Sequence, residues 1–250
     1  MQHCGFFGKR PLERDFVFEG LAAGMTDAWA AMMSDWLISA QSAFPQDWIE
    51  HYFDAPAWRF AISPGLLGPS AWCGLLCASA DTLGRAFPLA VLIPAQGRIS
   101  RLLFDSTAES VLDSLEVKSM AYIEGQISRK EFHAAIVESE NALRSVHVEE
   151  AGTDDLELSA QNEAMCLSFA RTSEEAIIAE NALCLRSLNA KQNSLPRSYW
   201  WQDGSENRPP ELCTWRGLPK GSGTGGFFAG MWETFGWQQE TIDPDRILRP

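Results

Sequence analysis

Apolar side chains recur with helical spacing near the start of the chain. Between Thr26 and Phe44 this stripe consists of Trp29, Met32, Met33, Trp36, Leu37 and Ala40. Intervals of three and four residues place these side chains on one face, which predicts an amphipathic helix. Pro45 favours the start of a second, short helix, which we expect to end before Pro56.

The pattern changes at Trp58 to short, uncharged runs separated by glycine and proline. These runs are WRFAI from Trp58, AWCGLLCAS from Ala71 and FPLAVLI from Phe87. We predict three strands of a central sheet, because the runs are short, apolar and bounded by turn residues. The link at residues 80–86 is short enough for the second and third strands to pair antiparallel. The third run is apolar at successive positions, as expected of a strand covered on both faces.

The middle of the chain is acidic and is predicted to be helical. Three capping boxes mark helix starts, at Ser106 to Glu109, Ser128 to Glu131 and Thr172 to Glu175. Because an apolar stripe follows each box, most of the acidic side chains are expected on solvated outer faces. A docking surface for a basic partner is the alternative interpretation of this acidic segment.

The last part of the chain predicts two more strands and a helix. We expect the strands at Tyr199 to Trp201 and around Cys213 to Trp215, and the helix to carry Phe227, Met231, Trp232 and Phe235. Helices before, between and after strands favour a layered α/β fold of the three-layer α/β/α kind, with a mixed, partly antiparallel sheet. A two-layer α+β arrangement is the alternative.

We predict a single domain over residues 1–250. It consists of an N-terminal half at 1–100, an acidic helical segment at 101–190 and a strand and helix segment at 191–250. The 10 tryptophans support this organisation, because five lie before residue 73, five after residue 199 and none between. The two ends of the chain are therefore expected to share one core. Neighbouring Trp200 and Trp201 must point to opposite faces of a strand, which leaves one of them available to line a groove.

Charge narrows the range of partners. The chain of 250 residues is 46% hydrophobic and carries a net charge of −13, and residues 101–190 alone hold 17 acidic and 7 basic side chains. An acidic surface without a Lys/Arg cluster disfavours nucleic acid and anionic membranes as partners. The N-terminus shows no secretory signal, and the uncharged stretch at 60–80 is interrupted by glycine and proline, so we expect a cytoplasmic protein.

The sequence carries no recognisable motif for catalysis or metal binding. None of the four histidines lies in a recognisable catalytic motif, and the six cysteines are predicted to be free, buried thiols. Residues 221–226 contain GxGxxG, but no apolar strand leads into them, so a flexible loop is favoured over a phosphate cradle. We therefore expect no catalytic residue, cofactor or metal. Asp81 and Arg85 are spaced to pair across Gly84, either as a hairpin staple or as part of an anion site.

Five motifs in order resemble the TagF/ImpM family of type VI secretion accessory proteins. They are GFFGKRPLERDFV from Gly5, APAWRF from Ala55, AWCGLLCASADTLGRAFPL from Ala71, YWWQDGSE from Tyr199 and RGLP from Arg216. The matches fall at both ends of the chain and leave the acidic middle unmatched.

The resemblance implies a non-enzymatic regulator in the cytoplasm that holds type VI secretion off after translation. Its implied partner is the forkhead-associated (FHA) scaffold protein of the secretion system, with a functional link to the Ser/Thr kinase–phosphatase switch. The motif positions that become candidate partner-binding residues are Lys9, Asp15, Arg59, Asp81, Arg85, Trp200, Trp201 and Ser205.

Two hypotheses follow for these residues. A protein-binding repressor predicts an exposed apolar or charged patch around the Lys9 to Asp15 loop, Arg59, Asp81 and Arg85, with no convergent acid, base and nucleophile. Under this hypothesis the ionic side chains are dispersed or form salt bridges with one another in the core. A protein that binds a small molecule or phosphate predicts that Arg59, Asp81, Arg85 and Ser205 converge on one cleft.

Overall fold

The computed structural model describes residues 3–95, 99, 102, 105–144, 164–169, 196–205 and 208–242. Its strands are β1 (Gly5–Gly8), β2 (Val17–Glu19), β3 (Trp58–Ile62), β4 (Ala71–Cys77), β5 (Leu89–Ala95), β6 (Ala164–Phe169), β7 (Arg197–Gln202), β8 (Glu211–Arg216) and β9 (Gln238–Ile242). Its helices are α1 (Ala23–Ala43), α2 (Trp48–Asp54), α3 (Ser106–Ile123), α4 (Arg129–Arg144) and α6 (Gly225–Ala229), with 3₁₀ turns at Gly221–Thr224 and Trp232–Phe235.

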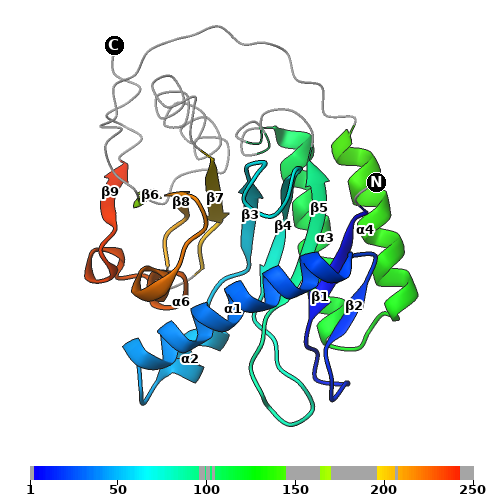
Figure 1. Ribbon diagram of the computed structural model, residues 1–250, viewed down its shortest axis with the longest axis horizontal. Helices are drawn as coiled ribbons and strands as arrows, with labels where there is room; N and C mark the ends of the chain where they lie inside the picture. The colour runs from blue at the N-terminus through cyan, green and yellow to red at the C-terminus, as the bar shows by residue number, and fades with distance from the viewer. Residues whose placement is uncertain are drawn as a thin grey trace, which may run out of the picture.

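All of these strands form one mixed sheet (Figure 1). The strand order is β2-β1-β5-β4-β3-β7-β8-β6-β9. β4 and β5 pair antiparallel, as their short link predicts, and β3 pairs antiparallel with both β4 and β7. β6 and β9 pair in parallel. The prediction of a mixed, partly antiparallel sheet is confirmed.

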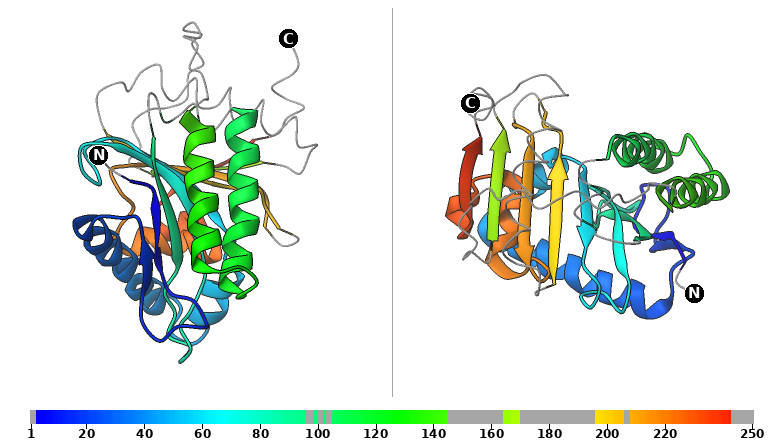
Figure 2. Two further views of the ribbon diagram at one scale, coloured as in Figure 1. Left: turned by 90° about the vertical axis from the view of Figure 1, so that its right-hand side faces the viewer. Right: turned by 90° about the horizontal axis from the view of Figure 1, so that it is seen from above.

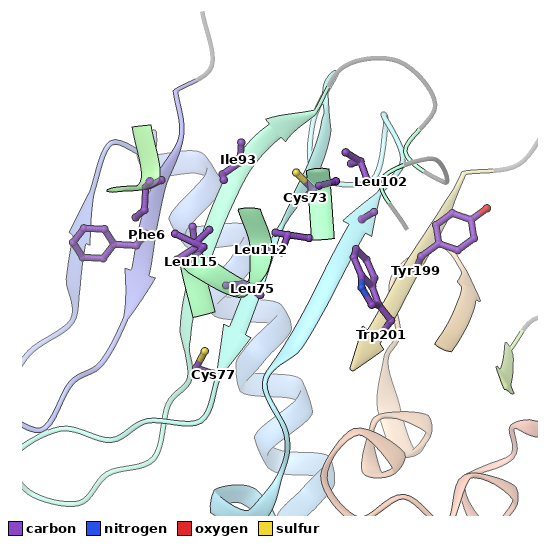
Figure 3. Packing of buried hydrophobic residues seen from close by; sticks show 14 of the residues in the cluster. Phe6, Cys73, Leu75, Cys77, Ile93, Leu102, Leu112, Leu115, Tyr199 and Trp201 are labelled. Atoms are coloured by element: carbon purple, nitrogen blue, oxygen red, sulfur yellow. The ribbon is translucent and has the colours of Figure 1, made fainter. Parts of the chain in front are cut away.

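Helices cover both faces of the sheet (Figure 2). α3 and α4 lie on one face, and α1, α2 and α6 lie on the other. Along β5, Leu89, Val91 and Ile93 join the core under α3 and α4, whereas Ala90 and Leu92 join the core under α1. This alternation explains the continuous apolar run of β5, and the three-layer arrangement is confirmed over the two-layer alternative. Figure 3 shows the core on the α3 side.

The core on the α1 side joins the two ends of the chain through aromatic rings. The Trp36 ring lies 5.0 Å from that of Trp200 and 4.4 Å from that of Phe227. The Trp36 indole N–H donates to the Pro219 carbonyl at 2.9 Å, and the Trp58 indole N–H donates to the Phe227 carbonyl at 3.0 Å. The expectation that the two ends share one core is confirmed.

Helix starts agree with the capping prediction in one case and differ in another. At α4, the Glu131 carboxylate accepts from the Ser128 N–H at 2.8 Å, and Ser128 Oγ accepts from the Glu131 N–H at 3.3 Å, which completes the predicted capping box. At α3 the cap is Asp105 rather than Ser106, because its carboxylate accepts from two backbone N–H groups of the first turn. The box at Thr172 to Glu175 lies outside the described residues.

Four strands were not predicted. β1, β2 and β9 lie in segments that we assigned no element, and β6 interrupts the acidic middle, which was predicted to be helical. The predicted closing helix is longer than the helix in the structure. α6 ends at Ala229, and two successive residues with positive φ, Gly230 (69°) and the left-handed Met231 (46°), separate it from the following 3₁₀ turn.

The glycine-rich run at 221–226 is also not a loop, contrary to our expectation. It forms a 3₁₀ turn followed by α6, and its glycines allow close packing of aromatic rings. A Cβ atom at Gly226 would lie 2.2 Å from the Trp232 ring, and one at Gly225 would lie 2.4 Å from the Phe235 ring. These glycines are therefore explained by packing rather than by a phosphate.

The five cysteines that the structure describes are free and buried, as predicted. Burial raises the pKa of the Cys73 thiol to about 12, so this thiol is protonated at neutral pH. Cys184 lies outside the described residues. In the described part of the chain, every helix is too short or too polar to cross a lipid bilayer.

We expect Phe227→Ala to lower the free energy of unfolding by about 3–5 kcal/mol, because Phe227 is buried among five tryptophan rings from both ends of the chain. Phe228→Ala is the matched control, since the Phe228 side chain is only partly buried. Urea unfolding monitored by tryptophan fluorescence measures both. Equal losses at the two positions would contradict the shared aromatic core.

Candidate functional site

Three of the sequence-predicted residues form one ion-pair cluster. Lys9 follows β1, and Asp81 and Arg85 lie in the connection between β4 and β5. Asp81 Oδ2 is 3.0 Å from Lys9 Nζ and 2.7 Å from Arg85 Nε. The Asp81 carboxylate is fully buried, whereas the Arg85 side chain is 58% exposed.

The second carboxylate oxygen of Asp81 holds the turn itself. Asp81 Oδ1 accepts from the backbone N–H groups of Leu83 and Arg85, at 2.9 and 3.0 Å. Burial acts to raise the pKa of Asp81, but hydrogen bonds from Lys9 and from the Arg85 and Leu83 amides hold that pKa well below its usual range. Asp81 is therefore ionised at neutral pH, and its arrangement is that of a hairpin staple.

Backbone contacts join the loop after β1 to the β4–β5 connection. Ser79 Oγ donates to the Lys9 carbonyl at 2.8 Å, and the Arg85 guanidinium donates to the Arg14 carbonyl at 2.9 Å. The Thr82 N–H donates to the Glu13 carbonyl, in the loop after β1, at 3.1 Å. Two motifs that are far apart in the sequence thus form one folded unit, which we call the paired loops (residues 9–16 and 79–87).

The paired loops expose apolar side chains to solvent. Leu12 is 61% exposed and Leu83 is 63% exposed. Phe16, whose ring stacks on that of Phe7, is also exposed. Asp15 is exposed in the same loop. Exposed apolar side chains therefore lie at the Lys9 to Asp15 loop, where a protein-binding repressor predicts them. The same hypothesis also places Arg59 and Asp81 in the exposed patch, and this part is wrong, because both side chains are buried.

Arg59 belongs to a second cluster with different partners. It lies on β3, and its side chain is 4% exposed. Its guanidinium contacts four carboxylates, three from α3 and one from the residues after β7. The Arg59 nitrogens lie 3.3 Å from Glu109, 2.6 Å from Asp113 and 3.2 Å from Glu116, and Arg59 also pairs with Asp203.

The charges of this Arg59 cluster are unbalanced, with one cation among four carboxyl groups. Burial raises the pKa of Glu109 to about 7; Arg59 opposes this rise, and Asp203, Asp113 and Glu116 add to it. Burial likewise raises the pKa of Glu116, against the effect of Arg59. The cluster therefore holds more negative charge than its arginine neutralises.

Carboxylate oxygens of Glu109, Asp113 and Asp203 lie within 4.8 Å of one another, close enough to share a cation. The Arg59 guanidinium already contacts all three of these residues. Arg59 is thus the counter-ion that the structure provides for them.

The remaining predicted residues take no part in the ion pairs of either cluster, although Trp201 lies opposite Arg59 where β7 pairs with β3. Trp200 and Trp201 point to opposite faces of β7, as predicted, and each is buried in a different core. Trp201 packs in the core on the α3 side (Figure 3), and Trp200 packs in the core on the α1 side, so the structure places both side chains in the interior. Ser205 is exposed in a turn, where its N–H donates to the Arg208 carbonyl at 2.8 Å.

Sequence reasoning missed the four carboxylates that surround Arg59. Glu109, Asp113 and Glu116 are spaced at i, i+4 and i+7, which places them on one face of a helix. This spacing is a signal that could have identified an acidic stripe, but the stripe was assigned to a solvated face. The fourth, Asp203, gives no such signal, since only the fold brings it to β3.

Asp81→Asn should lower the stability of the protein at neutral pH, because Lys9 and Arg85 lose their shared carboxylate. The pKa of Asp81 is lower in the folded protein than in the unfolded chain, where it is about 3.9. Its contribution is therefore complete above about pH 5 and is lost as the pH falls below that value.

Urea midpoints at neutral and acidic pH measure this effect, with the exposed Asp15→Asn as control. The difference between wild type and Asp81→Asn should shrink in acid. A difference that is constant with pH would show that the Asp81 charge does not stabilise the fold.

Glu109→Gln should gain stability relative to wild type as the pH rises from about 5 to 8. The folded-state pKa of about 7 exceeds that of an ordinary glutamate, so ionisation of Glu109 at rising pH destabilises the folded wild type. Glutamine cannot ionise and avoids this loss. Thermal unfolding over this pH range measures the gain in stability. Glu138→Gln, at an exposed position on α4, is the control. Equal pH profiles for the two variants would show that ionisation of Glu109 does not destabilise the fold.

Comparisons with known proteins identify the family. A family model described as the TagF N-terminal domain, type VI secretion system-associated, matches residues 5–138, which is more than half of the chain. The crystal structure of PA0076 from Pseudomonas aeruginosa PAO1 is similar, with a TM-score of 0.58 and 26% sequence identity over 91% of this chain and 94% of that one. A comparison with curated protein sequences gives no match. On the family match, this chain belongs to the TagF family of type VI secretion system-associated proteins.

Proposed function

We propose that this chain is a non-enzymatic negative regulator of type VI secretion, which acts after translation by binding the cytoplasmic FHA scaffold protein of the secretion system. Membership of the TagF family supports the association with type VI secretion. The observation that favours protein binding is the pairing of the candidate ionic side chains with one another. Asp81 is paired with Lys9 and Arg85, and Arg59 is paired with four carboxylates. Exposed apolar side chains also lie on the paired loops.

A small-molecule or phosphate-binding protein was the second hypothesis, and the geometry gives it less support. Arg59 and Arg85 pair with different carboxylates and do not converge on one cleft. An anion at Arg59 would meet the repulsion of the four surrounding carboxyl groups. Ser205 lies in a separate turn. Salt bridges between these ionic side chains and other groups of the same chain favour the protein-binding hypothesis.

The proposed regulator acts together with the Ser/Thr kinase–phosphatase switch of the secretion system or in parallel with it. A protein that masks the scaffold would change secretion without a chemical step of its own. The paired loops and the Arg59 cluster suit this role, because their ion pairs stabilise the fold and they carry exposed side chains that a partner could contact.

The test is a pull-down of the full chain from the cytoplasm of bacteria that carry the intact secretion system, with a deletion strain scored for secretion. We expect retention of the FHA scaffold and more secretion from the deletion strain, restored to low levels by the wild-type chain. Phe228→Ala should fold, because this side chain is only partly buried, and it controls for effects of expressing and purifying a variant. No retained scaffold with unchanged secretion would contradict the proposal and favour the ligand-binding alternative.

A further inference from the structure

An open groove runs along α3 on the face of the sheet that α3 and α4 cover. Its volume is about 460 Å³. The residues that line it are Arg59, Asp113, Glu116, Val117, Met120, Ala121, Glu124 and Gln126. The groove therefore begins at the Arg59 cluster and reaches the turn between α3 and α4.

The groove carries an excess of negative charge. Among its lining residues, Arg59 is the one cation, and it is already shared among four carboxylates. Asp113, Glu116 and Glu124 line the groove, and the Asp113 side chain is 55% exposed. The carboxylates at the groove therefore outnumber the cations that line it.

Apolar side chains stand beside these carboxylates. Val117 is 68% exposed and Met120 is 41% exposed, and both line the groove. They lie on the face of α3 that the sheet does not cover. An acidic groove with an exposed apolar rim is complementary to a segment that is both basic and apolar.

The groove is continuous with the paired loops. A Cβ atom at Gly125, in the turn after α3, would lie 2.5 Å from the Leu12 side chain and 3.5 Å from the Arg10 guanidinium. The Arg10 guanidinium lies over the ring of Tyr122 from α3, 4.1 Å from its centroid. One surface therefore extends from the acidic groove to the exposed Leu12.

We propose that this groove binds a basic, amphipathic segment of a partner protein, which places arginine or lysine against Asp113, Glu116 and Glu124 and apolar side chains against Val117 and Met120. The proposal rests on the proposed function, in that the chain acts by binding a protein, and it names the surface and the chemistry of the bound segment. The cationic groups of that segment supply the counter-charge that Arg59 alone does not.

The test uses the full chain and a synthetic peptide of alternating arginine and leucine, with binding measured by fluorescence anisotropy. Val117→Lys introduces a competing cation next to Asp113, one helical turn away. Its matched control is Ile38→Lys on α1, an equally exposed apolar position (62%) on the opposite face of the sheet. Both variants change the net charge by the same amount at exposed sites, so both should fold.

We expect the peptide to bind wild type and Ile38→Lys alike and to bind Val117→Lys about tenfold more weakly. A peptide with glutamate in place of arginine should not bind. A second variant, Asp113→Asn with Glu116→Gln, should also weaken binding, more than Asp27→Asn with Glu50→Gln on the opposite layer. Equal effects at groove and control positions would show attraction by net charge alone and would overturn the proposal, as would failure of wild type to bind the arginine peptide.

The same variants in the scaffold pull-down separate this proposal from the proposed function. Retention of the FHA scaffold by wild type and equally by Val117→Lys would overturn the groove and leave the regulatory function standing. Groove-dependent binding of the arginine peptide without retention of the scaffold by wild type would support the groove and contradict the proposed partner. Displacement of the peptide from wild type by Mg²⁺ alone at low millimolar concentration would instead identify the groove as a cation site and overturn the proposal.

Discussion

The central strands of the sheet are covered on both faces, and this constraint determines where the rest of the chain lies. Because β3, β4 and β5 have no solvated face, each consecutive side chain needs a partner in one of two cores. α3 and α4 provide the first core, and α1 with the C-terminal aromatic residues provides the second. Trp36 and Phe227 can meet only because α1 and α6 cover the same face. The first and last segments of the chain therefore fold as one domain.

Double coverage also explains why Arg59 needs α3. An arginine at a strand position that faces a core is buried, and a buried guanidinium must be paired. α3 crosses that part of the sheet and places three carboxylates next to it. A neutral or basic helix at this position would remove three of the four carboxylates that Arg59 contacts and leave Asp203. Part of the acidic character of the middle segment thus has a structural cause in one residue of β3.

Much of this fold could be predicted from local pattern, and the failures have physical causes. β3, β4 and β5 were identified because a strand buried on both faces is an uninterrupted apolar run. β2 has three residues at the sheet edge and carries too short a pattern to identify. β6 was missed because it is flanked by acidic residues typical of helices, and its parallel partner β9 comes from the far end of the chain. The length of α6 was misjudged because the left-handed conformation of Met231 has no signature in side-chain type.

The two ionic clusters were not equally predictable, and the difference bears on function. Asp81 and Arg85 are four residues apart, so the sequence alone indicates their pairing. In that cluster one buried carboxylate accepts from two cations and two backbone amides, and the interactions are complete within the chain. The Arg59 cluster is the reverse, since four carboxyl groups share one cation and the pKa of Glu109 is raised to about 7.

Repulsion among like charges opposes folding, so the need to pair Arg59 accounts for one or two carboxylates and not for four. The excess lies where α3 also exposes Val117 and Met120. A surface that keeps unbalanced charge beside exposed apolar side chains is stabilised when a cationic, apolar segment covers it. The two clusters thus differ in kind: the ionic contacts of Asp81 are complete within the fold, whereas the Arg59 cluster keeps the excess negative charge on which the proposed binding of a basic, apolar segment depends.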